Sequence, residues 1–232
     1  MSQRAPRPAR PAPPSRLPWA ILGVAVVGAL GLIGHQLWVN RPAATVAAVD
    51  YPTGLTPDGY PYKGNPQAAV VIEEYSDFQC PVCARYTREV APRLDEKYVK
   101  TGQVYYIFRY FPFLGPESFR AAEAAACAAE QGKFWEYEHV LFAHQRGENM
   151  GWFSDDRLIG FAPRAGLDPA AFGDCLRSGK YRDFIRQAAE AGRGRGVRAT
   201  PTLFINGEKI EGLYDAAFYE TYIDTLLQKK QK

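Results

Sequence analysis

Two cysteines, Cys80 and Cys83, are the residues of this chain best suited to chemistry. They are separated by two residues in SDFQCPVCARY, residues 76–86, directly after an apolar run. A zinc site needs about four ligands, and the other cysteines, Cys127 and Cys175, lie 48 positions apart, so they supply no second close pair. The residue after Cys83 is alanine, so the haem-attachment pattern C-x-x-C-H fails as well. We therefore expect no metal site and no haem.

A reversible disulfide explains this spacing better than a structural one. Closing so short a loop constrains the unfolded chain little, so the pair would stabilise the fold poorly. If Cys80 lies where a strand passes into a helix, the free N–H groups and the dipole of that helix stabilise its thiolate. Pro81 would occupy the first helical turn, where proline costs no hydrogen bond. Cys83, one turn further on, would be placed to attack a mixed disulfide at Cys80.

The segments around these cysteines predict a strand, a helix and a second strand. Residues 68–75, AAVVIEEY, are a short β-branched apolar run typical of a buried strand. A helix is expected from about 80 to 100, disturbed near Pro92. Residues 104–111, VYYIFRYF, have the aromatic and β-branched content of the next strand. A strand, helix and strand in this order favour a right-handed parallel crossover.

The rest of the chain predicts a helical block followed by a hairpin. Between 116 and about 192 the apolar residues follow helical spacing, and Ser118 is a plausible cap of the first helix. ATPTLFINGEKIEG predicts strand Thr202–Ile205, an Asn-Gly turn and strand Lys209–Glu211, and 215–228 closes the chain as a helix. The expected fold class is α/β: a mixed sheet flanked by helices, with an inserted all-helical subdomain over about 116–192.

The N-terminal part of the chain predicts a transmembrane helix. Residues 17–39 carry no charged side chain over 23 positions, which as a helix would span about 34 Å, enough for a hydrocarbon core of roughly 30 Å. Trp19 and Trp38 lie near its ends, as residues at a membrane interface do. Residues 1–16 form a basic, proline-rich tail with four arginines. This tail should stay cytoplasmic, so the C-terminal domain would face the extracytoplasmic, periplasmic side of the cell membrane.

A cleaved signal peptide is the alternative for this segment, with Val46–Ala48 as a small-residue cleavage site. The apolar run is longer than the roughly 7 to 15 residues usual for such a peptide, which favours an uncleaved single-pass anchor. Both interpretations export the domain to a compartment that permits disulfides. Residues 40–62, rich in Pro, Ala, Thr and Gly without a sustained period, predict a flexible linker, and 63–232 the folded domain.

The charge distribution gives no sign of nucleic-acid binding. The 232 residues carry a formal charge of +3, but the first 41 hold five arginines and no acid, which leaves 23 basic against 25 acidic residues. The folded part is therefore near neutral. GRGRGVR, residues 192–198, has only three arginines and leads into the next strand, so a connector explains it better than an RNA-binding or DNA-binding segment.

Four features together resemble the DsbA-like, membrane-anchored bacterial branch of the thioredoxin-fold thiol:disulfide oxidoreductases. CPVC, residues 80–83, follows the first strand of the domain, and Glu74 lies six residues before its first cysteine, where the family keeps a buried acid. Thr200-Pro201-Thr202 precedes a strand and matches the family's cis-proline loop. A helical block interrupts the fold between the second strand and that loop. The resemblance covers roughly residues 63–228 and implies a thioredoxin-like sheet.

The resemblance implies a role for each of these residues. Cys80 would be the exposed nucleophile, and Cys83 the buried resolving thiol. Glu74, rather than the glutamate before it, would face the core, because neighbours in a strand point to opposite faces. Desolvation would raise its pKa, so that it could exchange a proton with Cys83. A cis bond between Thr200 and Pro201 would expose backbone beside the disulfide, where a substrate strand can pair with it.

The other two cysteines, Cys127 and Cys175, both fall in the helical block. If Cys80 and Cys83 form the active pair, two cysteines are left, and we predict a structural disulfide between them. The alternative is two buried reduced thiols that pack as small apolar groups.

The expected function is that of an extracytoplasmic thiol:disulfide oxidoreductase that donates its disulfide to thiols of exported proteins. No organic cofactor is required, because the electrons move between sulfurs. By analogy, a DsbB-like or vitamin K epoxide reductase-like membrane partner would reoxidise the pair. A membrane-tethered reductase or isomerase is one alternative, although the tether at 40–62 is too short for the dimerisation domain that isomerases usually carry. A non-catalytic binding or chaperone module on the same scaffold is the other, and two intact cysteines argue against it.

Overall fold

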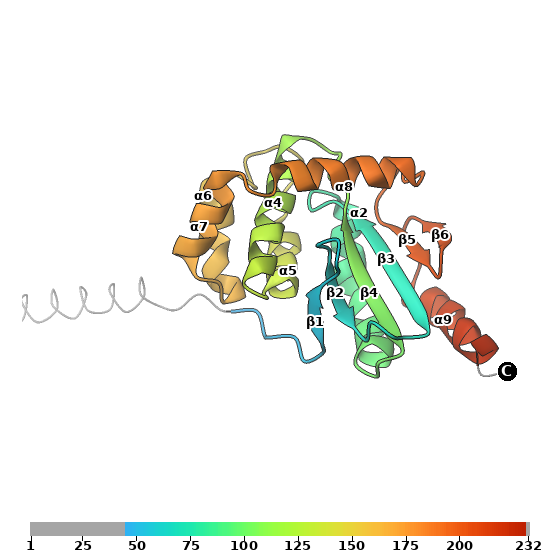
Figure 1. Ribbon diagram of the computed structural model, residues 1–232. Helices are drawn as coiled ribbons and strands as arrows, with labels where there is room; N and C mark the ends of the chain where they lie inside the picture. Colours follow the sequence, from blue (N-terminus) through green and yellow to red (C-terminus); the bar gives the residue numbers. More distant parts are fainter. Residues whose placement is uncertain (1–44, 231–232) are drawn as a thin grey trace, which may run out of the picture. The chain divides into compact units, whose positions relative to one another are not determined.

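A mixed six-stranded sheet forms the centre of the domain (Figure 1). The computed structural model describes residues 45–230. The strands lie in the order β1-β2-β4-β3-β5-β6; β3 and β4 are parallel, and the other four neighbouring pairs are antiparallel. Their bounds are β1 Thr53–Leu55, β2 Pro61–Gly64, β3 Val70–Ser76, β4 Val104–Tyr110, β5 Thr202–Ile205 and β6 Glu208–Glu211.

Strand β3 lies between β4 and β5 and carries the chain to the cysteine pair. Ile72 is opposite Tyr106 of β4 and Ile205 of β5, and all three side chains are fully buried. The hairpin from β5 to β6 turns at Asn206 and Gly207, whose φ angles of 50° and 88° are those that a two-residue turn of this kind requires. The two long strands, β3 and β4, and the hairpin predicted from the sequence are therefore confirmed.

The helix after β3 is short and is continued by two further turns. Helix α2 (Pro81–Glu89) ends before Val90, where α3 (Ala91–Leu94) begins a new turn, and a π-helical turn, η1 (Asp95–Val99), follows. Pro92 lies in the first turn of α3, where a proline is tolerated because its missing N–H has no helical partner. The predicted disturbance near this proline is confirmed.

The inserted helical block consists of five α-helices and a 3₁₀ turn. They are α4 Pro116–Glu130, α5 Phe134–His144, α6 Asp155–Phe161, η2 Ala162–Ala165, α7 Pro169–Ser178 and α8 Arg182–Gly194. Figure 1 shows α4 to α7 grouped beside the sheet and α8 reaching from them across the sheet. Asp168 caps α7 by accepting from the N–H groups of Ala170 and Ala171. Ser118 caps nothing, because α4 already begins at Pro116; its buried hydroxyl accepts a hydrogen bond from Gln79 instead.

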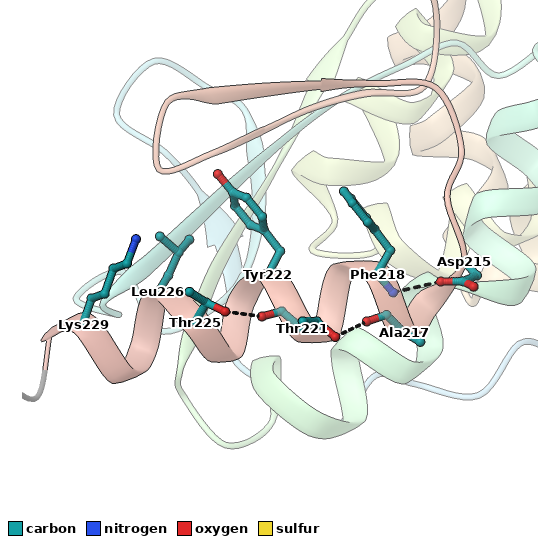
Figure 2. Close-up of a pocket in the computed structure, with 8 residues that line it drawn as sticks. All are labelled: Asp215, Ala217, Phe218, Thr221, Tyr222, Thr225, Leu226 and Lys229. Carbon is teal, nitrogen blue, oxygen red and sulfur yellow. Dashed lines mark hydrogen bonds between the residues drawn. The ribbon is translucent and has the colours of Figure 1, made fainter.

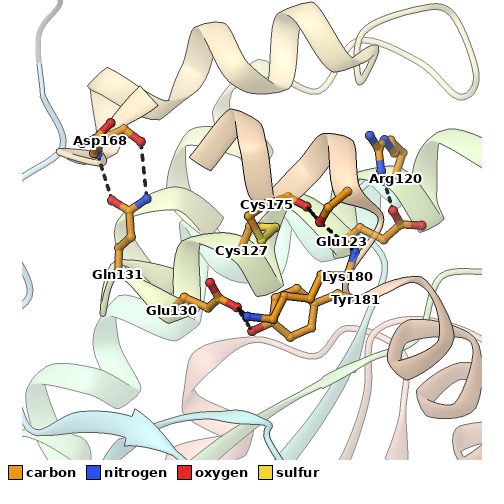
Figure 3. The surroundings of a disulfide bond; sticks show 10 residues. Arg120, Glu123, Cys127, Glu130, Gln131, Asp168, Cys175, Lys180 and Tyr181 are labelled. Carbon is orange, nitrogen blue, oxygen red and sulfur yellow. Dashed lines mark hydrogen bonds and ion pairs between the residues drawn. A yellow bond between two sulfur atoms is a disulfide. The ribbon is translucent and has the colours of Figure 1, made fainter. Parts of the chain in front are cut away.

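A disulfide joins two helices of this block. Cys127 of α4 and Cys175 of α7 are bonded, with their Cα atoms 5.9 Å apart, and they are the pair expected from the sequence (Figure 3). Glu130, one turn after Cys127, binds both Lys180 and Tyr181 in the segment that follows α7. The disulfide and these contacts hold α4 and α7 together at the point where the chain turns into α8.

The start of the domain differs from the sequence prediction. Residues 53–62, expected within a flexible linker over 40–62, contain β1 and the start of β2, and β2 pairs with β4. Before them, Val46 and Tyr51 pack against the core. The linker prediction is therefore wrong where β1 and β2 form, from residue 53 onward. Strand β1, at the edge of the sheet, pairs with β2, and β2 pairs with β4. Both strands are short and contain Pro or Gly, so they leave no periodic pattern in the sequence.

The predictions for the extreme N-terminus fall on residues that the structure does not describe. The basic tail, 1–16, and the apolar segment, 17–39, both lie outside 45–230. Of the helices within the described range, including the C-terminal helix α9 (Ala216–Lys230), none has both the length and the apolar character needed to cross a membrane.

Candidate active site

The two cysteines lie at the start of α2. Cys80 is the N-cap residue, with an extended backbone (φ −73°, ψ 118°), and Pro81 takes the first helical position. Both thiols are free. Cys83 is completely buried, as expected, whereas Cys80 is only 6% exposed. The prediction that Cys80 is exposed is wrong, because Cys80 is buried and its sulfur atom contacts the loop at Thr200.

The surroundings of Cys80 favour its thiolate. A hydrogen bond from the Cys83 thiol lowers the pKa of Cys80 to about 6, while burial opposes the shift. The side chain of Thr200 and the backbone N–H groups of Cys83 and Val82 act in the same direction as the Cys83 thiol. These N–H groups belong to the first turn of α2, where they have no helical acceptor. Burial, followed by the neighbouring Cys80, raises the pKa of Cys83, so the shared proton stays on Cys83.

The loop before β5 lies against Cys80. The Thr200–Pro201 peptide bond is cis, as the resemblance implied, and the Thr200 carbonyl oxygen lies 3.3 Å from the Cys80 sulfur. Thr200 Oγ1 is buried without a hydrogen-bond partner among the described residues, which leaves its hydroxyl free to donate to a thiolate. The Pro201 carbonyl accepts from the Gly212 N–H at 2.9 Å. Thr200 is therefore the residue of this loop that meets the reactive sulfur.

Glu74 is buried beneath the cysteine pair. Glu74 belongs to β3, and only 2% of the residue is exposed. Its Oε2 atom accepts a hydrogen bond of 2.7 Å from the Tyr106 hydroxyl. That hydroxyl is also 3.0 Å from the hydroxyl of Tyr86 in α2. Burial, followed by the negative charge of Glu138, raises the pKa of Glu74 to about 7. Glu74 also contributes to raising the pKa of Cys83. A carboxyl group that titrates near neutrality beside a buried thiol is suited to exchanging a proton with it.

Comparison with known proteins agrees with this geometry. A family model described as Thioredoxin matches residues 57–225. The crystal structure of Wolbachia pipientis alpha-DsbA1 superposes with a TM-score of 0.68 at 26% identity, over 75% of this chain and 94% of that chain. The chain belongs to the DsbA-like thioredoxin family. The fold shared with that structure includes the sheet on which the cysteine pair is placed.

Two curated relatives of this DsbA-like domain differ in name and in the share of their length that the chain matches. Probable disulfide bond formation protein D of Bacillus anthracis is 27% identical, over 66% of this chain and 72% of that protein. Na(+)/H(+) antiporter NhaA 1 of Mycolicibacterium gilvum is 34% identical, over 88% of this chain but 33% of that protein. The chain thus spans about a third of the length of the antiporter relatives it matches, and the antiporter name describes the whole of those proteins.

Polar residues before the CPVC motif fix the DsbA-like site, and sequence reasoning missed them. Asp77 is 1% exposed and accepts hydrogen bonds from the N–H groups of Gln79 and Phe113, each at 2.8 Å. The Gln79 amide donates to Ser118 at 2.8 Å and accepts from the Asn149 N–H at 2.6 Å. The loop that leads into α2 is therefore bound to the start of α4 and to the segment between α5 and α6. Their partners lie about 35 to 70 positions away, so no local pattern could reveal them.

The neighbouring carboxylate, Glu73, points to the other face of the sheet. It accepts from Arg109 and Arg195, each at 2.8 Å, and Arg109 also pairs with Asp58 at 2.9 Å. Alternation along β3 thus places Glu74 in the core, as predicted, and leaves Glu73 in a surface ion-pair network. Arg109, in β4, belongs to this network.

A separate hollow of about 460 Å³ lies along the outer face of α9 (Figure 2). Phe218, Tyr222 and Leu226 contribute to its wall, and none of the predicted site residues lines it. The hydroxyls of Thr221 and Thr225 donate to carbonyls one turn earlier in the same helix, so they are already satisfied.

Proposed function

We propose that the chain is an extracytoplasmic, membrane-tethered protein disulfide oxidase that oxidises thiols of exported proteins. The observation that carries the proposal is the environment of Cys80, whose pKa is lowered to about 6. A stabilised thiolate stabilises the reduced dithiol form relative to the disulfide, and this makes the disulfide a stronger oxidant. A surface thiol without this environment would not stabilise the reduced dithiol relative to the disulfide.

The proposed reaction transfers two electrons from a substrate dithiol to the cysteine pair. A substrate thiolate attacks the Cys80 sulfur, the Cys80–Cys83 bond breaks, and the Cys83 sulfur leaves with the electron pair and takes a proton from Glu74. A second substrate thiolate then attacks the substrate sulfur of the mixed disulfide. Cys80 leaves as a thiolate, and the substrate keeps a disulfide. Backbone at Thr200 would position the substrate strand during these steps.

The proposed location is supported by two features of the chain. Residues 17–39 have the length and apolar character of a membrane anchor, and the Cys127–Cys175 disulfide suits an oxidising compartment. A phosphatase reporter fused after the last residue should be active, and a matched reporter that folds only in the cytoplasm should be inactive. The mass of the mature chain then distinguishes an anchor from a cleaved signal peptide. The opposite reporter pattern would refute export.

Turnover would require a membrane partner that reoxidises the dithiol, which we propose to be DsbB-like or vitamin K epoxide reductase-like. The decisive measurement is the equilibrium reduction potential of Cys80–Cys83 in glutathione buffers, made on the full chain in detergent. We expect a value closer to the DsbA figure of about −120 mV than to the thioredoxin figure of about −270 mV. A value near the latter would reverse the direction of electron flow and make the chain a reductase.

A further inference from the structure

Two buried tyrosine hydroxyls form a chain of hydrogen bonds that ends on the Glu74 carboxyl group. The Tyr106 hydroxyl of β4 lies 2.7 Å from Glu74 Oε2 and 3.0 Å from the hydroxyl of Tyr86. Tyr86 is in α2, three residues after Cys83, and both tyrosines and Cys83 are completely buried. The chain therefore runs from the helix that carries the resolving cysteine to the carboxyl group beneath it.

The aromatic rings that carry these hydroxyls are held by packing. The Tyr106 ring meets the Trp135 ring edge-on, with the ring centres 6.0 Å apart, and the Lys63 ammonium group lies 4.6 Å from the centre of the Tyr106 ring. The Tyr86 ring packs edge-on against Tyr219 of α9 at 5.8 Å. A buried ring packed in this way has little freedom to move its hydroxyl. The carboxyl group at the end of the chain therefore meets a donor in a fixed position.

The number of hydrogens in this chain decides which carboxyl oxygen can carry a proton. A hydroxyl has one hydrogen to donate. Within residues 45–230 the Tyr86 hydroxyl bonds only to Tyr106, so it donates to Tyr106, and Tyr106 donates to Glu74 Oε2. The opposite direction would leave the Tyr86 hydrogen buried without an acceptor, which is costly. The acid proton of neutral Glu74 then lies on Oε1, which is buried and has no hydrogen-bond partner among the described residues.

We propose that Tyr106 is a positioning residue that holds Glu74 Oε2 and so leaves the acid proton on Oε1, the oxygen from which Cys83 takes it. This inference rests on the proposed role of Glu74 as the proton donor to Cys83. When a substrate thiolate breaks the Cys80–Cys83 bond, the Cys83 sulfur keeps the electron pair and takes the proton from Oε1, and the carboxyl group becomes a carboxylate. Tyr106 and Tyr86 then stabilise that carboxylate without changing partners, because both hydrogen bonds already point toward it.

The titratable groups around Glu74 set the pH range in which this arrangement holds. Burial and the charge of Glu138 raise the pKa of Glu74 to about 7, and the Tyr106 hydroxyl opposes this shift because it donates to the charged form. Glu74 is therefore mostly protonated at pH 6, with or without that hydroxyl. The groups that face Glu74 from other elements are Lys63 of β2, Cys83 and Tyr86 of α2, Tyr106 of β4, Glu138 of α5 and Tyr219 of α9.

The test is Tyr106→Phe in the full-length chain in detergent, with two measurements on the oxidised protein. Loss of the hydroxyl removes a donor to the carboxylate, so the apparent pKa of Glu74, followed by carboxyl-carbon NMR, should rise by about one unit. At pH 6 the rate at which dithiothreitol reduces the Cys80–Cys83 disulfide should fall by roughly tenfold, because the proton is no longer held on Oε1. If the hydroxyl acted on charge alone, this rate would not fall, and the proposal would be wrong.

A double-mutant cycle tests whether Tyr106 acts through Glu74. Glu74→Gln alone should slow the reduction, and adding Tyr106→Phe to it should slow the reduction no further. Tyr137→Phe is the matched control, because Tyr137 is completely buried and its hydroxyl donates to the Leu158 carbonyl at 2.9 Å. This control should leave both the Glu74 titration and the rate at pH 6 unchanged.

Tyr86→Phe keeps the proposal testable if Tyr106→Phe does not fold. Tyr106 then donates without a second hydroxyl behind it, so the pKa of Glu74 should rise and the rate should fall, each by less than in Tyr106→Phe. An unchanged titration in the tyrosine variant, an equal effect of Tyr137→Phe, or a further loss when Tyr106→Phe is added to Glu74→Gln would overturn the proposal. An unchanged rate in Glu74→Gln would remove the proton role of Glu74 as well, whereas the oxidase function is tested separately by the reduction potential.

Discussion

Cys80 and Cys83 are free thiols one helical turn apart at the start of α2, whereas Cys127 and Cys175 are 48 residues apart and bonded across α4 and α7 (Figure 3). The first pair lies beside free backbone N–H groups, a threonine hydroxyl and a buried carboxyl group. The second pair forms a disulfide that links α4 to α7. Loop length and polar surroundings, rather than residue type, thus decide which pair can exchange electrons and which holds the fold.

Removing the nucleophile should have the largest effect on activity. In Cys80→Ser no sulfur can accept the attack of a substrate thiolate, so we expect essentially complete loss of disulfide transfer to a reduced peptide. Given a peptide that already contains a disulfide, Cys83→Ser should instead accumulate mixed disulfides at Cys80, because the Cys80 thiolate opens the peptide disulfide and the resolving thiol is gone. Full activity in Cys80→Ser would favour a non-catalytic binding or chaperone role for the domain.

Removing the second pair should affect stability and leave chemistry intact. The double variant Cys127→Ala, Cys175→Ala frees a loop of 48 residues in the unfolded chain, which corresponds to a loss of about 4 kcal/mol in the free energy of unfolding. Urea unfolding measures this loss, and peptide oxidation at low temperature checks the activity of the folded fraction. If activity fell as far as in Cys80→Ser, the two pairs would share one redox function.

The sequence predicted the reactive pair and its immediate neighbours well, because the relevant signals are local. Period two along β3 placed Glu74 in the core, and the TPT motif located the loop at Thr200. The Asp77 and Gln79 network and the Tyr106 hydroxyl that binds Glu74 could not be found in this way. Their partners come from other elements far along the chain, so only the tertiary fold brings them together.

The buried acid near the reactive pair should make stability depend on pH. The pKa of Glu74 is raised from 4.5 to about 7 by burial and then by Glu138, so its contribution to stability is complete below about pH 4.5 and is lost as pH rises through 7. Glu74→Gln removes this loss and should be more stable than the wild type by about 3 kcal/mol near pH 8, with no gain near pH 4.

Urea unfolding of the oxidised protein at both pH values measures this difference, because the bonded cysteines do not titrate. Glu73→Gln is the control, since Glu73 is on the opposite face of the same strand and is paired with Arg109 and Arg195. It should show no gain near pH 8. A gain in Glu74→Gln that is equal at both pH values would mean that Glu74 does not ionise in this range.

The smallest predicted effect separates the contribution of the loop from that of the helix to the reactivity of Cys80. Thr200→Val removes a buried hydroxyl that has no other partner among the described residues, and it should raise the pKa of Cys80 by about one unit, or about 1.4 kcal/mol. Thr202→Val is the matched control, because its hydroxyl donates to the Ala199 carbonyl at 2.7 Å. The pH dependence of Cys80 alkylation in the reduced protein measures both variants. If Thr200→Val left that dependence unchanged, the N–H groups of α2 and the Cys83 thiol would account for the thiolate alone, and the loop would act only in binding substrate.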